Sequence, residues 1–370
     1  MSAQTGPVGV GVVGAGTISS AYLRHMASFP DVDVRYVADL VPERAAAQAA
    51  AYGVEGFGSV EELLERDDVE IVVNLTVPAA HAEVGAAALA AGKHLWNEKP
   101  LATDRKSGAA LVAQAEEAGL LLGCAPDTVL GPGMQAARRL IERGDIGTPL
   151  TASAVMQYPG PHRWHPNPDF LYQAGGGPLF DMGPYYLTAL IQLFGPVTRV
   201  AARGAGAGPT RVVGEGPRAG ESFEVTVPTY VTALYDFAGG RIATLTLSFD
   251  SPLTRVGVLE VAGTSATLAT SDPNDFLGDL KIARTGSAEW EPIEVHGVHG
   301  GRGIGVVDMA RALRTGGRHR ATGRVALHVL DAMFATATSL EENRFVAVES
   351  TFEPIPPMPA DFNPFTATLT

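Results

Sequence analysis

The sequence is poor in cysteine and in basic residues, and each shortage excludes a class of protein. Cys124 is the single cysteine among 370 residues, so the chain cannot form an internal disulfide or a cysteine-rich metal site. The chain has 27 Lys and Arg residues against 40 Asp and Glu residues, which gives it a formal net charge of −13. That charge repels phosphate backbones and anionic lipids, which argues against nucleic acid and membrane surfaces as partners. A lone thiol also suits a reducing compartment, so we expect a cytoplasmic protein.

An internal repeat is also lacking, and so is a basic segment ahead of the first apolar run. The opening MSAQTGPVGVGVVGAG passes directly into a strand pattern, so we expect neither an export signal nor a membrane anchor. The length of 370 residues, 46% of them apolar, suits two globular domains better than one.

Residues 1–125 alternate short β-branched runs with alanine-rich stretches, a pattern typical of a parallel sheet covered by helices. We predict a Rossmann-type α/β domain over this range, with glycines closing its helices. The expected strands are Val8–Val13, Val32–Ala38, Ile71–Leu75, His94–Trp96 and Leu120–Gly123, and the expected helices include Pro42–Tyr52 and Ala79–Ala91.

Residues 126–370 show a different pattern. Segments in which apolar and polar residues alternate, such as EVTVPTYVTALYDF and RIATLTLSF, predict strands, with helices only at intervals. We predict an α+β domain for substrate binding and oligomerisation, with an open, mostly antiparallel sheet and a C-terminal tail that can return to the first domain. Helices near Pro178–Phe194 and Val325–Glu341 are expected to cover one face of the sheet. The uncovered face then requires a partner, so we expect a homodimer or homotetramer.

The segment VGVVGAGTISS places Gly14, Gly16 and Ser19 in a G-x-G-x-x-S arrangement between a strand and a helix. Small residues let the backbone approach a pyrophosphate, whose charge is stabilised by the N–H groups and dipole of the helix N-terminus. Gly14, Gly16, Thr17 and Ile18 are therefore candidate dinucleotide contacts, although the same spacing also suits an ordinary tight turn.

Two further features favour a dinucleotide. Asp39 ends the second predicted strand, close to where a carboxylate accepts hydrogen bonds from the adenosine ribose. Leu40 follows in place of a basic residue, so we favour NAD over NADP, with Arg44 the remaining candidate for a 2′-phosphate. The run NLTVPAAH then passes from strand to helix at the carboxyl edge of the sheet, where dinucleotides bind.

Three segments, NLTVPAAH, GKHLWNEKP and GGGPLFDMGPYY, together resemble the Gfo/Idh/MocA family over nearly the whole chain. The resemblance implies a Rossmann domain followed by an open-sheet domain, and NAD(P)-dependent oxidation or reduction of a carbinol carbon in a sugar or cyclic polyol. The family's Glu-Lys-Pro motif matches Glu98, Lys99 and Pro100, which implies that Lys99 is catalytic and that Glu98 contacts the nicotinamide ribose. The family's strand-end motif, altered here, implies cofactor contacts from Thr76, Val77 and His81.

Hydride transfer leaves the protein to manage a proton and the charge on the substrate oxygen. A cation about 4 Å from that oxygen, at an effective dielectric of ~20, stabilises it by ~4 kcal/mol. This is roughly three orders of magnitude in rate. Most lysines are solvated loop residues. Because Lys99 follows an apolar strand at the edge where ligands bind, we predict that it supplies this cation.

The family's other signature is a glycine run, an aspartate and, four residues later, a histidine or a tyrosine. Here it is Gly175–Gly177, Asp181 and Tyr185, which resembles the tyrosine-bearing branches of the family. We predict that Tyr185 relays the proton and that Asp181 orients the substrate or pairs with Lys99. The alternatives are a packing role for Tyr185 and a helix-capping role for Asp181.

The segment YPGPHRWHPNPDFLYQAGGG is a proline-punctuated loop rich in aromatic and polar residues. Sugars are bound by this mixture, because aromatic faces pack on C–H surfaces while polar side chains bond hydroxyl groups. The alternative is a rim that packs against a neighbouring subunit. His162 and His165 lack the helical presentation of metal ligands, so we expect no metal. The candidate substrate contacts are Trp164, His165, Asp169, Tyr172 and Gln173 in this loop, with Asp127 and Arg302 outside it.

The expected function is an NAD(P)-dependent dehydrogenase or reductase acting on a sugar, glycoside or cyclic polyol. One alternative is a glycoside hydrolase that uses tightly held NAD to oxidise and re-reduce its substrate. The other is an NAD-binding regulator without catalysis. The presence of the lysine, the aspartate and the tyrosine together argues against the regulator, which has no need of all three.

Overall fold

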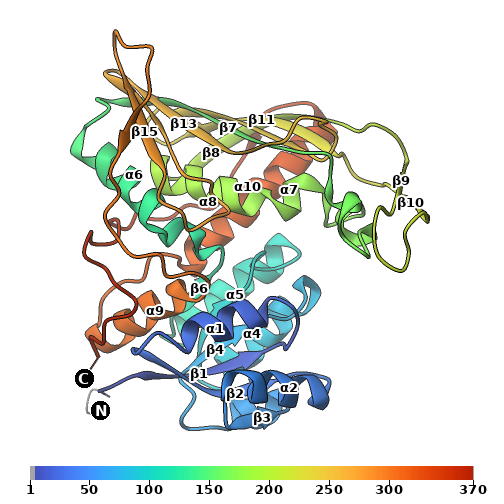
Figure 1. The fold of residues 1–370 in the computed structure, drawn as a ribbon, viewed down its shortest axis with the longest axis vertical. Helices are drawn as coiled ribbons and strands as arrows, with labels where there is room; N and C mark the ends of the chain where they lie inside the picture. Colours follow the sequence, from blue (N-terminus) through green and yellow to red (C-terminus); the bar gives the residue numbers. More distant parts are fainter. Residues whose placement is uncertain (1–4, 370) are drawn as a thin grey trace. The chain divides into compact units, whose positions relative to one another are not determined.

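The computed structural model describes residues 5–369, which form two compact units (Figure 1). The first unit takes the chain up to residue 135, residues 296–330 and the chain from 355 onward. The second takes residues 136–295 and 331–354. These bounds differ from the predicted ranges 1–125 and 126–370, because a helical segment from late in the chain joins the first unit. Residues 1–4, the start of the segment in which no export signal is expected, lie outside the described residues.

The first unit contains a six-stranded parallel sheet in the order β3-β2-β1-β4-β5-β6. The predicted strands are present, with identical bounds for the first two, and the edge strand β3 was not predicted. The strands are β1 (Val8–Val13), β2 (Val32–Ala38), β3 (Gly56–Gly58), β4 (Ile71–Asn74), β5 (His94–Asn97) and β6 (Leu122–Cys124).

The helices of this unit follow the strands as expected of a doubly wound fold. Helix α2 starts with Pro42 and ends at Gly53, whose φ of 70° is the left-handed conformation that glycine adopts most easily. The helices are α1 (Ser19–Met26), α2 (Pro42–Tyr52), α3 (Val60–Leu64), η1 (Pro78–Ala80), α4 (His81–Ala90), α5 (Arg105–Glu117), η2 (Asp127–Leu130) and α9 (Ile304–Thr315).

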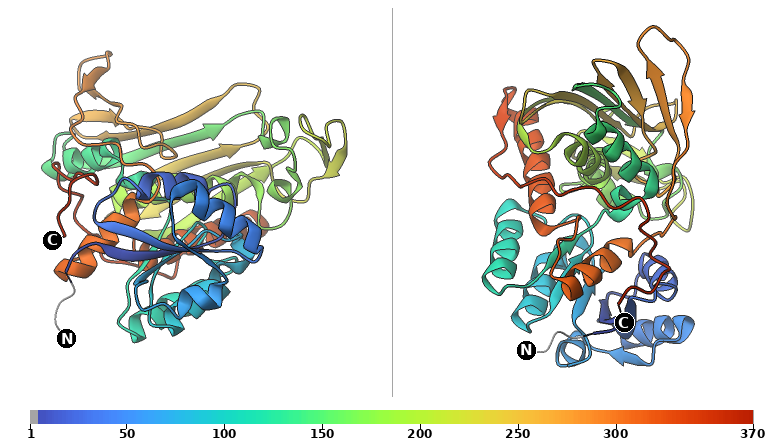
Figure 2. Two further views of the ribbon diagram at one scale, coloured as in Figure 1. Left: turned by 60° about the horizontal axis from the view of Figure 1, so that its bottom comes forward. Right: turned by 90° about the vertical axis from the view of Figure 1, so that its left-hand side faces the viewer.

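Helix α9 was not expected in the first unit. Its side chains at Ile304, Val306, Val307 and Met309 are buried, and the helix contacts β6, η2 and β2. The end of the chain lies beside α9, where Arg311 donates to the carbonyl oxygen of Asn363 (Figure 2). Burial of this apolar face explains why residues distant in sequence complete the Rossmann unit.

The second unit contains a nine-stranded sheet in the order β16-β15-β14-β13-β7-β12-β11-β8-β17. Only the β7 and β12 pair is parallel among its described pairings, so the predicted open, mostly antiparallel sheet is confirmed. The strands are β7 (Pro149–Gln157), β8 (Val197–Ala205), β11 (Tyr230–Phe237), β12 (Ile242–Ser248), β13 (Arg255–Gly263), β14 (Ala266–Ala269), β15 (Leu280–Arg284), β16 (Glu291–Ile293) and β17 (Val346–Ala347). A separate hairpin consists of β9 (Thr210–Val212) and β10 (Ser222–Glu224).

Helices cover one face of this sheet (Figures 1 and 2). Strand β11 alternates buried and more exposed residues, and its buried Tyr235 bonds Thr336 of α10. The predicted helix over Pro178–Phe194 is divided at Met182. The helical segments are α7 (Gly177–Asp181), α8 (Gly183–Phe194), η3 (Pro161–Arg163) and η4 (Asp169–Tyr172), while α6 (Pro132–Arg143) and α10 (Gly323–Glu342) each contain a boundary between the units. Within residues 5–369, no helix is both long enough and apolar enough to cross a membrane.

Candidate active site

The glycine-rich turn after β1 has the features of a nucleotide-binding turn. Gly14 has a φ of 100°, and a Cβ on it would lie 2.8 Å from the carbonyl of Leu75, so only glycine fits. At Gly16 nothing lies within 4 Å of the position of a Cβ, which leaves open space above the turn. Thr17 is exposed and Ile18 is half-buried at the start of α1. The turn therefore fits a ligand that approaches the backbone closely.

Asp39 supports this turn from the end of β2. Its Oδ2 accepts from the N–H of Ala15 at 2.7 Å, and its Oδ1 accepts from the N–H of Val41 at 2.8 Å. A carboxylate has about four acceptor positions, so these two bonds leave capacity for ribose hydroxyl groups. Leu40, which is 95% exposed, follows it. The structure thus gives Asp39 a turn-holding role in addition to the predicted contact with the cofactor.

The loops after β4 and β5 are tied together by buried polar groups. His81 is buried, with Nε2 3.0 Å from the carbonyl oxygen of Thr76 and Nδ1 2.6 Å from that of Pro100. The side chain of Thr76 donates to Asn74 at 2.7 Å, and Asn74 donates to Asn97 at 2.7 Å. His81 therefore positions two loops at the carboxyl edge of the sheet. Val77, 66% exposed, lies on the first of these loops.

Glu98 and Lys99 follow β5 at the same edge, as predicted. The Glu98 carboxylate is buried, and its Oε2 accepts from the N–H of Lys99 at 2.8 Å. Its Oε1 accepts from the hydroxyl of Tyr22 in α1 at 2.9 Å. Lys99 is half-buried and precedes the cis-proline Pro100. Tyr22 was missed at the sequence level, because nothing local to α1 indicates that a tyrosine there meets a carboxylate from β5.

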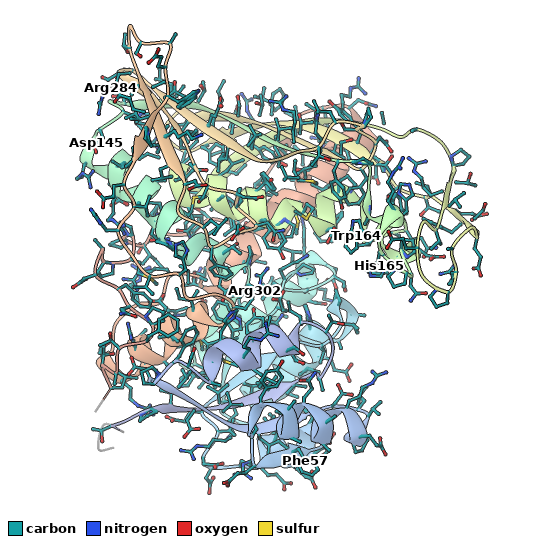
Figure 3. All side chains as sticks on the ribbon, viewed as in Figure 1. Phe57, Asp145, Trp164, His165, Arg284 and Arg302 are labelled. Atoms are coloured by element: carbon teal, nitrogen blue, oxygen red, sulfur yellow. The ribbon has the colours of Figure 1, made fainter. Side chains whose placement is uncertain are left out.

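Asp127 and Arg302, both predicted to bind substrate, are bonded to each other. The Asp127 side chain is fully buried, its Oδ1 lies 3.4 Å from Nη1 of Arg302, and its Oδ2 accepts from the N–H of Gly303 at 2.7 Å. Burial raises the pKa of Asp127 to about 6, against the opposing effect of Arg302. In this structure the pair holds the N-terminus of α9, where Figure 3 labels Arg302.

In the second unit, Asp181 and Tyr185 lie on either side of a helix break. Asp181 is the last residue of α7, and Tyr185 is buried in the first turn of α8. Tyr158, which was not singled out from the sequence, lies after β7 and interacts electrostatically with Asp181. Burial, followed by the Asp181 charge, raises the pKa of Tyr158 far above its usual value. Because α7 ends at Asp181 and α8 begins at Gly183, the four-residue spacing between Asp181 and Tyr185 does not place the two side chains on one face of a continuous helix.

The loop ahead of α7 divides into an exposed part and a buried part. Trp164 is 57% exposed, and its ring meets that of His165 edge-on at 5.7 Å (Figure 3). His165 in turn meets the ring of Phe170, which is 58% exposed. Gln173 is also exposed. This exposed aromatic cluster, Trp164, His165 and Phe170, can offer faces to a ligand.

Tyr172 and Asp169 hold the same loop internally. Tyr172 is fully buried, and its hydroxyl lies 2.7 Å from Nδ1 of His162. Asp169 pairs through both oxygens with Arg218 at 2.7 and 3.1 Å, and this bonding lowers the pKa of Asp169. Both residues thus support the loop, and direct contact with substrate stays a prediction. Among residues 5–369, no group of three or more His, Cys, Asp or Glu is arranged to hold a metal.

Two family models match this chain. Residues 8–125 match the model described as "Oxidoreductase family, NAD-binding Rossmann fold", and residues 134–269 match "GFO/IDH/MocA C-terminal domain". The chain belongs to the Gfo/Idh/MocA oxidoreductase family. The predicted Rossmann fold and NAD-binding domain are confirmed by this membership.

The curated relatives of this chain include a sugar reductase. The dTDP-3,4-didehydro-2,6-dideoxy-alpha-D-glucose 3-reductase of Actinomadura kijaniata is 35% identical over 190 residues, covering 50% of this chain and 56% of the relative. The chain thus spans about half the length of that relative. The trans-1,2-dihydrobenzene-1,2-diol dehydrogenase of Oryctolagus cuniculus is 29% identical over 270 residues, covering 71% of this chain and 75% of the relative.

A solved structure agrees over a longer region. Levoglucosan dehydrogenase in complex with NADH and L-sorbose superimposes with a TM-score of 0.81 at 22% identity. The match covers 93% of this chain and 99% of that one. At this level of identity, the match shows that the two proteins share a fold. The matched region includes both of the units described above.

Proposed function

We propose that the protein is an NAD-dependent oxidoreductase that transfers a hydride between nicotinamide and a carbinol carbon of a sugar, glycoside or cyclic polyol. The observation that carries the proposal is the Glu98-Lys99-Pro100 motif at the carboxyl end of β5 in an NAD-binding Rossmann unit. The named activities of the relatives, a sugar reductase and a diol dehydrogenase, support this reaction class.

The first unit supplies the groups to hold NAD, which when bound accepts or supplies the hydride. The open space at Gly16 suits the pyrophosphate, next to Thr17 and Ile18. Asp39 retains acceptor positions for the adenosine ribose, and its negative charge disfavours a 2′-phosphate. Thr76, Val77 and Glu98 complete the proposed set along the loops after β4 and β5, and His81, predicted as a cofactor contact, acts by holding these loops in place.

Lys99 stabilises the substrate oxygen as its charge develops. Tyr185 relays the hydroxyl proton, and Asp181 orients the substrate. The exposed rings at Trp164 and His165 suit the C–H faces of a sugar, while Gln173 suits its hydroxyl groups. Asp127, Arg302, Asp169 and Tyr172 act in this proposal by fixing the elements around the substrate.

The test compares two lysines at opposite ends of β5. NAD and a panel of sugars, glycosides and cyclic polyols should give rising NADH absorbance with the wild-type protein. Lys99→Ala should lower kcat by roughly three orders of magnitude, because the cation on the substrate oxygen is lost. Lys93→Ala is the matched control, since Lys93 precedes β5 and donates to the backbone of Arg66 at 2.6 Å.

Lys93→Ala should keep wild-type kinetics. Equal activity in wild type and Lys99→Ala would contradict the mechanism. Glycoside cleavage without net NADH formation would instead indicate a hydrolase with transient oxidation, and NAD binding without turnover on any carbinol would indicate a regulator.

Two further proposals concern the setting of the reaction. A homodimer or homotetramer would cover the face of the nine-stranded sheet that the helices leave open. A cytoplasmic location remains the prediction from the cysteine content.

A further inference from the structure

A chain of buried hydrogen bonds lies behind the Glu98 carboxylate. The indole N–H of Trp96 donates to the hydroxyl of Tyr22 at 3.4 Å, and that hydroxyl donates to Oε1 of Glu98 at 2.9 Å. Both aromatic side chains are fully buried. The other carboxylate oxygen accepts from the N–H of Lys99, so both oxygens of Glu98 have donors. The carboxylate is thereby held in one orientation.

The N-terminus of α9 packs against the buried side chains of Trp96 and Tyr22. A Cβ on Gly305 would lie 1.9 Å from the Trp96 indole, whereas one on Gly303 would lie 2.9 Å from the Met26 side chain and 3.7 Å, an ordinary contact distance, from the Tyr22 ring. Gly305 therefore lets the helix pack directly against the Trp96 ring, and Gly303 leaves room for Met26 beside Tyr22. Asp127 fixes the helix terminus by accepting from the N–H of Gly303. Tyr22 is thus fully buried, with its hydroxyl bonded to both Trp96 and the Glu98 carboxylate.

We propose that Tyr22 is a positioning residue that aims the Glu98 carboxylate at the nicotinamide ribose. The inference rests on the proposed function, because it assigns Glu98 to the bound NAD. Tyr22 itself acts through Glu98 and does not touch the reacting atoms. Without the tyrosine hydroxyl, Oε1 of Glu98 would lose a buried donor, and the carboxylate would turn to find another partner.

The test measures NAD affinity by titration calorimetry, so that it needs no known substrate. Tyr22→Phe keeps the buried ring and removes the hydroxyl, and it should weaken NAD binding about tenfold, the effect of one hydrogen bond to a charged group. The matched control is Tyr235→Phe. Tyr235 is equally buried, and its hydroxyl bonds Thr336 at 2.8 Å in the second unit. That variant should lose similar thermal stability and keep wild-type NAD affinity.

A double-mutant cycle separates positioning from general support of the fold. In a Glu98→Ala background, adding Tyr22→Phe should change NAD affinity less than about twofold, because the carboxylate that Tyr22 positions is gone. A tenfold loss that persists in that background would overturn the inference, as would wild-type affinity in Tyr22→Phe alone. Failure of the wild-type protein to bind NAD would overturn the proposed function, and the inference with it.

Discussion

At the residue scale, two of the predicted site residues also hold the backbone around them. Asp39 accepts from the glycine-rich turn, and His81 joins two loops by contacts with their carbonyl oxygens. Asn74 and Asn97 add a buried amide pair that sequence reasoning missed. Buried polar groups require partners, so the residues that hold a site are often those whose bonding cannot be read from spacing.

The assignment of the proton relay is a prediction at this scale. Tyr185→Phe should lower kcat by at least about 100-fold, since a positioned acid or base contributes that much. Tyr158→Phe is the matched control, because Tyr158 interacts electrostatically with Asp181, while its raised pKa, caused first by burial, makes its hydroxyl a poorer proton donor. Steady-state kinetics on the same substrate compare the two variants.

Tyr158→Phe should keep kcat within about threefold of wild type, corresponding to less than one kcal/mol in the barrier. The opposite result, a large loss in Tyr158→Phe with Tyr185→Phe unaffected, would transfer the relay to Tyr158.

At the scale of elements, helix boundaries decide which side chains meet. The sequence predicts helix near Pro178–Phe194, with Pro184 making a helix either begin near Gly183 or kink there, and in the structure α7 ends at Asp181 and α8 begins at Gly183. Pro184 explains part of this division, because proline fits the first turn of a helix and disrupts its interior. The N-terminus of α9, in turn, depends on Asp127 from another part of the chain.

The pH dependence of the Asp127 contact is a prediction for α9. The folded pKa of Asp127 is about 6, above the ordinary value of 3.8. The folded state therefore binds the carboxyl proton more tightly than the unfolded state does. Protonation of Asp127 thus adds to the free energy of unfolding below about pH 4, and this stabilisation is lost as the pH rises toward 6. Two pKa units correspond to ~3 kcal/mol. Denaturant unfolding of wild type and Asp127→Asn should reveal it.

Relative to Asp127→Asn, wild type should lose roughly 2 to 3 kcal/mol in free energy of unfolding between pH 4 and 7. A difference between the two proteins that stays constant over this range would show that Asp127 does not titrate there.

At the scale of the whole molecule, segments distant in sequence complete each unit. Asp31 is fully buried before β2, and it accepts hydrogen bonds from Thr368, Leu369 and Arg311. Burial alone would raise the pKa of Asp31, yet these donors lower it. The end of the chain is thus bonded into the first unit.

Self-association through the open sheet face is the prediction at this scale. Val155 in β7 lies on that face, in register with Thr246 of β12 and Val258 of β13. Val155→Glu should reduce the oligomer to a monomer, because a carboxylate in an interface core is costly to bury. Light scattering during gel filtration measures the mass.

Ser287→Glu, at an exposed turn of the same unit, is the control and should keep the wild-type mass. A wild-type protein of monomer mass, or an unchanged oligomer in Val155→Glu, would contradict the proposed interface.

The sequence by itself determined the main strands and helices and the position of the Glu98-Lys99-Pro100 motif. Alternating β-branched runs set the strands of both sheets, and Gly14, Asp39 and Glu98 to Pro100 marked the carboxyl edge, because local sterics and periodicity act between near neighbours. Only the tertiary structure decided that α9 joins the Rossmann unit and that Tyr22 bonds Glu98. Those contacts join residues 76 or more positions apart, and they are selected by packing and by the requirement that buried polar groups be bonded.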